Sequence, residues 1–213
     1  MTTPPPTRSV KFSDDERGGW SSDRPRREGA APRPVDISVR GRVLSPTDRL
    51  RYSPGSLVMV VSPAKSERDR FTRRTLIEDQ AAVLSLDKVR ALLAGRVPAE
   101  EVEERAAQLL DAAAAKRFEA GESVVIAADG LSPEERDHWA RLAHRFRRPR
   151  HLILIEAGRD QVADDDRAPL NELRKALDAG ALGDAGFHTA LRLSGPTIAE
   201  LKRIVFRQAP RDE

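Results

Sequence analysis

Several residue types and patterns are missing from this chain of 213 residues, and each absence removes a class of function. Without cysteine there is no disulfide, no thiolate nucleophile and no cysteine metal ligand. The four histidines are scattered and form no H-x-x-x-H or H-E-x-x-H pair, so no metal site is expected. No apolar run approaches the roughly 18 residues of a membrane span, and the N-terminus lacks an apolar signal segment. We therefore expect a cytoplasmic protein with no membrane partner.

Aromatic residues are also scarce, at 4% of the chain against 33% for charged residues. The core must therefore be aliphatic, which favours helices packed on a sheet. The formal net charge is +3, and the basic excess lies towards the N-terminus, where residues 1–56 hold 11 Lys and Arg against 7 Asp and Glu. A mildly basic tail on a nearly neutral body fits nucleic-acid contact, and it fits a merely solvated tail equally well.

The chain divides into three parts by composition. Residues 1–34 are rich in Pro, Arg, Ser and Gly without apolar periodicity, which predicts a disordered basic tail. Residues 35–55 are expected to form an ordered arm or linker, with a short edge strand in "VDISVRGRVLS" (35–45) and a turn-rich link after it. Residues 56–208 form the predicted domain.

Within that domain, apolar runs alternate with helical patterns. The expected strands are Leu57–Val61, Ala81–Ser85, Ser123–Ala128, His151–Ala157 and Thr189–Gly195. The expected helices include Ser66–Ile77, one that closes at Gly95, Val97–Gly121, one that opens on Ser132 with a capping box, Pro169–Gly180 and Pro196–Phe206. Five buried strands separated by helices predict an α/β fold with a doubly wound parallel five-stranded sheet.

In such a sheet, ligands bind beyond the carboxyl ends of the strands. The loop after the first strand of the domain is therefore the first candidate for a phosphate-binding loop. It reads "SPAKSERDRF" and contains no glycine. A phosphate loop of the form G-x-x-x-x-G-K-[ST] needs glycines so that backbone N–H groups can curl round the phosphates, a lysine to reach them and a hydroxyl for magnesium. The loop does not satisfy this pattern.

Later segments nevertheless carry a family resemblance. "VLSLDKVRALLAG" and "AAKRFEAGESVVIAADGLSPEERDHWARLA" follow one another as in the P-loop kinase domains of the bacterial polynucleotide 5′-kinase and zeta-toxin-like group, which are AAA-type ATP-binding kinase domains. The resemblance covers roughly the last three quarters of the chain. It implies a P-loop NTPase fold of the kinase-like type, with a degenerate Walker A loop.

Placed on the family loop, the candidate cofactor-binding residues are Lys65, Ser66, Arg68 and Asp69. Lys65 and Glu67 stand at glycine positions, Arg68 at the lysine and Asp69 at the magnesium-binding hydroxyl. Glu67 and Asp69 would direct negative charge at a triphosphate. We therefore expect no cofactor, with ATP and magnesium used only if the protein is an active kinase.

The resemblance also places two further residues near an acceptor. Asp87 stands where the family has the general base for a 5′-hydroxyl, and Arg90 follows one helical turn later as a candidate acceptor or phosphate contact. The alternative for Asp87 is a simple role in capping or solvating the start of its helix.

The densest basic cluster is "HRFRRPRH", with Arg145, Arg147, Arg148 and Arg150 around an aromatic residue. Such a cluster could bind nucleic-acid phosphates. Its alternative is the polar end of a helix, where basic side chains interact favourably with the helix dipole.

The sequence therefore predicts a pseudo-kinase, a binding or regulatory module for nucleic-acid ends or for an active kinase-like protein partner. One alternative is an active ATP-dependent polynucleotide or small-molecule phosphotransferase with Asp87 as general base. Another is a structural interaction protein that binds through its N-terminal tail.

Overall fold

A computed structural model describes residues 34–207 of the protein. The chain divides into two compact units, Met1–Val35 and Asp36–Glu213, and every helix and strand of the described residues lies in the second. The tail predicted to be disordered falls almost entirely outside the described residues.

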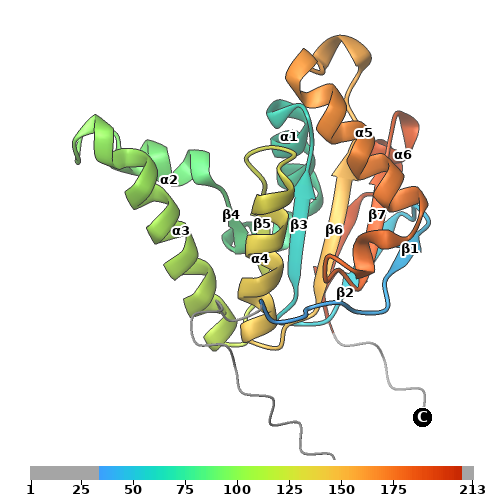
Figure 1. The fold of residues 1–213 in the computed structure, drawn as a ribbon, viewed down its shortest axis with the longest axis horizontal. Coiled ribbons are helices and arrows are strands. Elements are labelled where there is room, and N and C mark those ends of the chain that lie inside the picture. The colour runs from blue at the N-terminus through green and yellow to red at the C-terminus, as the bar shows by residue number, and fades with distance from the viewer. Residues whose placement is uncertain (1–33, 208–213) are drawn as a thin grey trace, which may run out of the picture. The chain divides into compact units, whose positions relative to one another are not determined.

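A six-stranded parallel sheet forms the centre of the second unit (Figure 1). Its strands, in spatial order, are β1 (Arg42–Leu44), β7 (Thr189–Leu193), β6 (Arg150–Ile155), β3 (Leu57–Val61), β5 (Val124–Ala127) and β4 (Val83–Leu84). All five neighbouring pairs are parallel. The predicted doubly wound α/β architecture is confirmed, and β1 adds a sixth strand at the edge.

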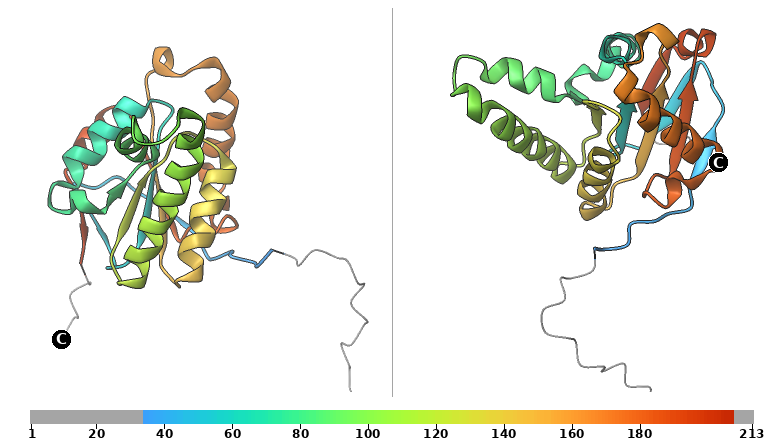
Figure 2. Two further views of the ribbon diagram at one scale, coloured as in Figure 1. Left: turned by 90° about the vertical axis from the view of Figure 1, so that its left-hand side faces the viewer. Right: turned by 45° about the horizontal axis from the view of Figure 1, so that its top comes forward.

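Helices cover both faces of this sheet, as its parallel connections require (Figures 1 and 2). The α-helices are α1 (Lys65–Thr75), α2 (Leu86–Leu93), α3 (Val102–Glu119), α4 (Pro133–Arg145), α5 (Asp164–Asp178) and α6 (Pro196–Glu200). The 3₁₀-helices are η1 (Ile77–Ala82), η2 (Ala99–Glu101), η3 (Arg159–Gln161) and η4 (Ala181–Gly183). Helices α3, α4 and α5 lie on one face, whereas α1 and α6 lie on the other.

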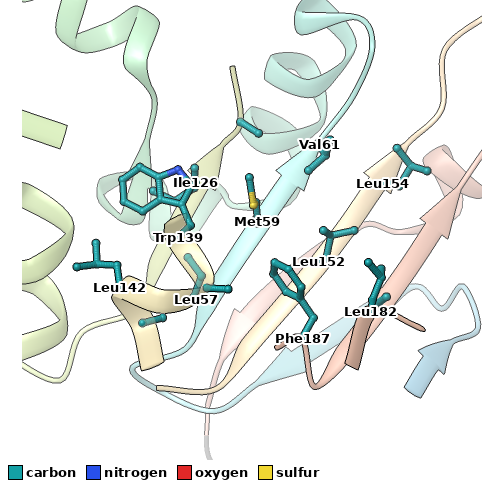
Figure 3. Packing of buried hydrophobic residues seen from close by; sticks show 14 of the residues in the cluster. Leu57, Met59, Val61, Ile126, Trp139, Leu142, Leu152, Leu154, Leu182 and Phe187 are labelled. Carbon is teal, nitrogen blue, oxygen red and sulfur yellow. The ribbon is translucent and has the colours of Figure 1, made fainter. Parts of the chain in front are cut away.

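The alternation of side chains along each strand divides the core into two layers. On β3, Leu57 and Met59 point to the layer under α3, α4 and α5, whereas Val58 and Val60 point to the layer under α1. Figure 3 shows the first layer, in which Trp139 of α4 packs among aliphatic side chains. The prediction of an aliphatic core is confirmed, and Trp139 is buried in it at 3% exposure.

The largest departure from the predicted elements is a second, two-stranded sheet. Strand β2 (Arg49–Tyr52) pairs in parallel with β8 (Arg203–Phe206). The sequence predicts a turn-rich link at the first segment and the end of a closing helix at the second. The helix instead stops at Glu200, because Leu201 takes an extended conformation (ψ 106°) that leads into β8.

This two-stranded sheet is attached to the main sheet through its apolar side. Leu50, Tyr52 and Ile204 lie in the same core layer as Val58 and Val60. The ring of Tyr52 stacks on His151 of β6, with 4.2 Å between ring centroids. His151 in turn lies 2.8 Å from the hydroxyl of Thr189, measured from its Nδ1.

Smaller differences concern the ends of elements. The predicted edge strand over 35–45 is a strand only at Arg42–Leu44, although Ile37 before it is buried in the core. Val43 within this strand is exposed. Helix α5 begins at Asp164 and contains Pro169 within its second turn, five residues earlier than predicted. None of the helices among residues 34–207 is long and apolar enough to cross a membrane.

Candidate functional site

The connection between β3 and α1 is the first part of the candidate site, and it is short. Only Ser62–Ala64 separate the two elements, and residues from Lys65 onward are helical. The backbone N–H groups of Glu67 and Arg68 donate to the carbonyl of Ala64 at 3.1 and 3.2 Å. No residue from Ser62 to Asp69 has a positive φ. The first turn of α1 thus occupies the stretch where a phosphate loop would curl round its ligand.

Arg68, which the resemblance places at the family lysine, is fully buried with 1% exposure. Its Nε and Nη2 donate to Oδ1 of Asp69 at 2.9 and 2.8 Å. Nη1 donates to the carbonyl of Ala128 just after β5, and Nη2 also lies 3.4 Å from Oδ2 of Asp87. Every nitrogen of the guanidinium is therefore engaged inside the protein.

Lys65 points to carboxylates that follow two neighbouring strands. Its Nζ lies 2.5 Å from Oδ1 of Asp129, just after β5, and 3.5 Å from Oδ1 of Asp87, at the start of α2. Ser66 beside it is exposed. The two carboxylates meet there because the carboxyl ends of parallel strands lie at one edge of the sheet.

Arg90 completes this arrangement from α2. It donates to Asp87 at 2.9 Å, to Asp129 at 3.1 Å, and through Nε and Nη2 to both oxygens of Glu103 at 2.8 Å. The hydrogen bonds of Glu103 and then of Asp129 raise the pKa of Arg90. We call these seven side chains the ion-pair network: Lys65, Arg68, Arg90, Asp69, Asp87, Asp129 and Glu103. It holds three cations against four carboxylates.

The network also sets the ionisation of its central carboxylates. Burial raises the pKa of Asp87, but the hydrogen bond from Arg90 and the charge of Lys65 outweigh burial and leave the pKa below its ordinary value. The same balance lowers the pKa of Asp129, where burial is outweighed by hydrogen bonds from Arg90 and Lys65. Both groups are firmly ionised at neutral pH.

Glu135 holds the segment that carries Asp129. Its carboxylate accepts hydrogen bonds from the N–H groups of Asp129 at 3.0 Å and Gly130 at 3.4 Å. Its own N–H donates to the hydroxyl of Ser132 at 3.1 Å, which is half of the predicted capping box. Because Glu135 is largely buried, its pKa is raised. It therefore positions the turn after β5 and does not contact the cations directly.

A pocket of about 330 Å³ lies beside the network, between α1, β4 and α2. Its polar lining includes Asp69, Thr72, Ser85, Asp87 and Lys88. The hydroxyl of Ser85 accepts a hydrogen bond from the N–H of Lys88 and so caps α2. The cap is therefore Ser85, and the capping alternative for Asp87 does not hold. Asp87 is instead a member of the ion-pair network in the first turn of α2.

The four arginines predicted to bind nucleic acid do not form one surface. The expected exposed phosphate-binding role is corrected for Arg148 and Arg150. Arg145 and Arg147 are exposed. Arg148 donates to the carbonyl of Phe118, and Arg150 is buried, with hydrogen bonds to the carbonyls of Gly186 at 2.5 Å and Ile37 at 3.3 Å. Arg148 and Arg150 thus satisfy backbone carbonyls, and Arg150 is inaccessible to a phosphate.

The segment after β6 forms a second small pocket, of about 380 Å³. Three arginines line it, but Arg174 is held by Glu156 at 2.9 Å and Arg167 pairs with Asp164 at 2.9 Å. The remaining one, Arg159, lies in η3. This region, like the network, has most of its positive charge matched by nearby carboxylates.

Comparison with known proteins concerns the fold and not the site. A family model described as an AAA domain matches residues 69–172, just under half of the chain. No curated protein matches the chain. Together, the family match and the parallel sheet identify an α/β P-loop kinase-like fold. The matched segment begins at Asp69, so the Ser62–Arg68 stretch lies outside it.

Among solved structures, the chain is similar to a candidate kinase from Chloroflexus aurantiacus. The two share 16% sequence identity, with 65% of this chain and 84% of the other covered and a TM-score of 0.42. A likeness at this level carries no argument about activity.

Sequence reasoning found five of the seven network members as site residues or replaced family positions: Lys65, Arg68, Asp69, Asp87 and Arg90. Asp129 and Glu103 are not among the residues predicted for the site. Glu103 has no local signal, because an acidic residue in the first turn of a helix is explained by the helix dipole alone.

Proposed function

We propose that this protein is a non-catalytic P-loop kinase-like module, which serves binding or regulation and does not transfer phosphate from ATP. One observation carries the proposal: each cation at the phosphate position is already paired with a carboxylate of the same chain. A triphosphate would have to displace these carboxylates before it met an available positive charge.

The energy of that displacement supports the proposal. A like-charge pair at about 4 Å costs on the order of 4 kcal/mol at an effective dielectric of 20. A micromolar ligand has a binding free energy of only about −8 kcal/mol. Asp69, Asp87 and Asp129 all lie within the network, so two such contacts would remove ordinary nucleotide affinity.

The state of Asp87 argues in the same direction. A general base needs a free oxygen and a pKa near the working pH. Oδ1 of Asp87 faces Arg90 and Lys65, and Oδ2 faces Arg68, while the pKa lies below its ordinary value. Both features make this carboxylate a weak proton acceptor.

The competing function is an active phosphotransferase in which Asp87 is the base and Arg68 replaces the lysine. It is favoured by the approach of these two residues to 3.4 Å beside a polar pocket. A buried arginine is nevertheless a poor replacement, because its planar fork is fixed where a compact, mobile ammonium is needed.

A phosphotransfer assay separates the two functions. The full chain is incubated with γ-labelled ATP, magnesium and 5′-hydroxyl RNA or DNA, beside the Asp87→Asn variant and an active polynucleotide kinase as assay control. We expect no label transfer by either form of this protein. Transfer by the unaltered chain that is abolished in Asp87→Asn would establish the phosphotransferase and remove our proposal.

A further inference from the structure

The two-stranded sheet has a basic outer side that lies apart from the ion-pair network. On β2, Leu50 and Tyr52 point inward and are buried, so Arg49 and Arg51 point outward and are exposed. On β8, Arg203 is exposed, whereas Val205, which lies on the same side and opposite Arg51, is buried. Lys202 and Arg207 flank them and are exposed as well. We call this surface the arginine ribbon, defined by Arg49, Arg51, Lys202, Arg203 and Arg207.

Like charges stand next to each other on the ribbon. Arg49 and Arg203 are register partners in the parallel pair, which places their Cα atoms roughly 4.8 Å apart. Like charges directly opposite each other destabilise a strand pair. The protein keeps this arrangement although replacing either arginine by a neutral residue would relieve it.

Nearby carboxylates compensate only part of this charge. Glu78 of η1 lies 2.9 Å from Arg203 and 3.8 Å from Arg207, so a single carboxylate serves two arginines. Arg49, Arg51 and Lys202 have no ion-pair partner within residues 34–207. The ribbon is thus a row of cations whose charge is available to an external anion.

The shape of the row suggests the kind of anion. At about 3.3 Å per residue, Arg49 and Arg51 stand roughly 7 Å apart, and Arg203 and Arg207 roughly 13 Å apart. An extended row of this length suits a chain of repeated charges better than a small anion. Guanidinium groups pair with phosphate oxygens through two parallel hydrogen bonds, which favours phosphodiesters over isolated carboxylates.

We propose that the arginine ribbon binds the phosphate backbone of a nucleic acid without sequence preference. Phosphate contacts position a protein on nucleic acid, and they carry no base information. The proposal is independent of the phosphate position near Arg68, because the ribbon acts without nucleotide. It also differs from the predicted Arg145–Arg150 cluster, in which two arginines are committed to backbone carbonyls.

The test is fluorescence anisotropy of a labelled 20-nucleotide polyuridine strand and a 20-base-pair duplex, titrated with the full chain without ATP at 50 and 200 mM NaCl. We compare the unaltered chain with Arg49→Gln/Arg51→Gln. Each phosphate contact to a single strand contributes about −0.7 to the salt slope. The variant should therefore lose about 1.4 from the slope, with Kd raised roughly tenfold at 50 mM NaCl.

A matched control is Arg145→Gln/Arg147→Gln, which removes the same charge from an exposed surface elsewhere and leaves residues 1–33 intact. It should change Kd by less than about threefold, the effect of general charge alone. The proposal is overturned if neither nucleic acid binds at 50 mM NaCl, or if the two double variants weaken binding equally.

A third arm uses vesicles with 30% phosphatidylserine, because Ile77 beside Glu78 is 73% exposed and could insert into a lipid surface. We expect no vesicle binding that depends on Arg49 and Arg51. Loss of vesicle binding in the ribbon variant, with nucleic-acid binding unchanged, would assign the ribbon to membranes and contradict the proposal. Since no arm contains ATP, each outcome is independent of the phosphotransfer result.

Discussion

Arg68 and Arg49 show how differently one residue type is used in two regions of this protein. Arg68 is buried in the ion-pair network, where every nitrogen of its guanidinium donates to an oxygen of the same chain. Arg49 is exposed on the ribbon, next to another arginine and without an ion-pair partner within residues 34–207. The number of basic residues in a region therefore does not predict whether that region binds an anion. What matters is whether carboxylates of the same chain already neutralise them.

Removal of Arg68 should have the largest effect on stability. The Arg68→Met variant keeps a long apolar side chain but leaves Asp69 without its cation and the carbonyl of Ala128 without its donor, and Asp87 keeps only Arg90 and Lys65. Removing one partner of a buried pair typically costs 3–5 kcal/mol. Because both carboxylates are partly exposed, we expect a loss of about 3 kcal/mol in the free energy of unfolding, measured by urea denaturation.

The control is Arg70→Met on the same helix, where the side chain is 71% exposed and pairs with Glu67. An exposed pair of this kind contributes at most about 0.5 kcal/mol. Equal losses in the two variants would show that Arg68 is no more integral to the structure than a surface arginine.

Acid should act on the attachment of the ribbon through His151. Burial, followed by the charges of His188 and Arg42, lowers the pKa of His151 to about 3, whereas the unfolded chain has a value of about 6.5. The folded state therefore holds His151 neutral while the unfolded state gains a proton, so stability is lost as pH falls below 6.5. We expect this residue to contribute a loss of about 1.5 kcal/mol between pH 6.5 and pH 5.

Urea denaturation at several pH values tests this expectation. The His151→Gln variant keeps a polar side chain that does not titrate, so it should lose correspondingly less stability over the same range. An identical pH dependence in the variant and the unaltered chain would mean that His151 does not anchor the ribbon through its neutral form.

Removing two carboxylates from the ion-pair network should leave Lys65 unpaired among residues 34–207, as Arg49 and Arg51 are on the ribbon. In Asp87→Asn/Asp129→Asn, Lys65 and Arg90 lose their shared carboxylates. We expect a loss of about 1 kcal/mol in stability, since both carboxylates are partly exposed, together with a new increase in Tm on addition of pyrophosphate. The control variant Asp164→Asn/Asp165→Asn removes the same charge from α5 and should show no response to pyrophosphate. Failure of the network variant to respond would mean that shape, and not charge pairing, closes the phosphate position.

The smallest effect on stability is expected at the ribbon itself. Arg49→Gln/Arg51→Gln should leave the free energy of unfolding unchanged or raise it by up to about 0.5 kcal/mol, because a like-charge contact is relieved. The urea midpoints of the variant and of the unaltered chain measure this change in stability. A loss above about 1 kcal/mol would show that these arginines hold the two-stranded sheet together and are not kept for an external partner.

The sequence predicts five of the six strands of the main sheet because each is mainly apolar, a pattern that depends on the segment alone. The β2–β8 pair escapes prediction because each segment is short and mixes arginine with apolar residues, and its strand character depends on a partner about 150 positions away. Taken alone, the segment Pro196–Phe206 fits a helix as well as it fits a strand. Tertiary pairing decides between the two.

For the site, the family resemblance singles out Asp87 and Arg90, and the structure brings both into the network that contains Lys65 and Arg68. It does not reveal that these groups neutralise one another, since ion pairs such as Arg90 with Glu103 depend on how α2 packs against α3. The burial of a charged residue also cannot be predicted from the local sequence. The sequence suggests that Arg150 is a surface cation, although the residue is only 3% exposed in the structure.

Carboxylates of the same chain already neutralise Lys65, Arg68 and Arg90, and we predict that ATP therefore does not bind beside them. A thermal-shift titration of the full chain with ATP and magnesium tests it most directly, with each component alone as control. We predict no change in Tm up to 1 mM ATP. A ligand at a hundredfold excess over its Kd adds about 2.7 kcal/mol of stability, so an affinity of 10 μM would give a clear rise in Tm. Such a rise, dependent on magnesium, would show that the protein binds ATP despite its paired cations.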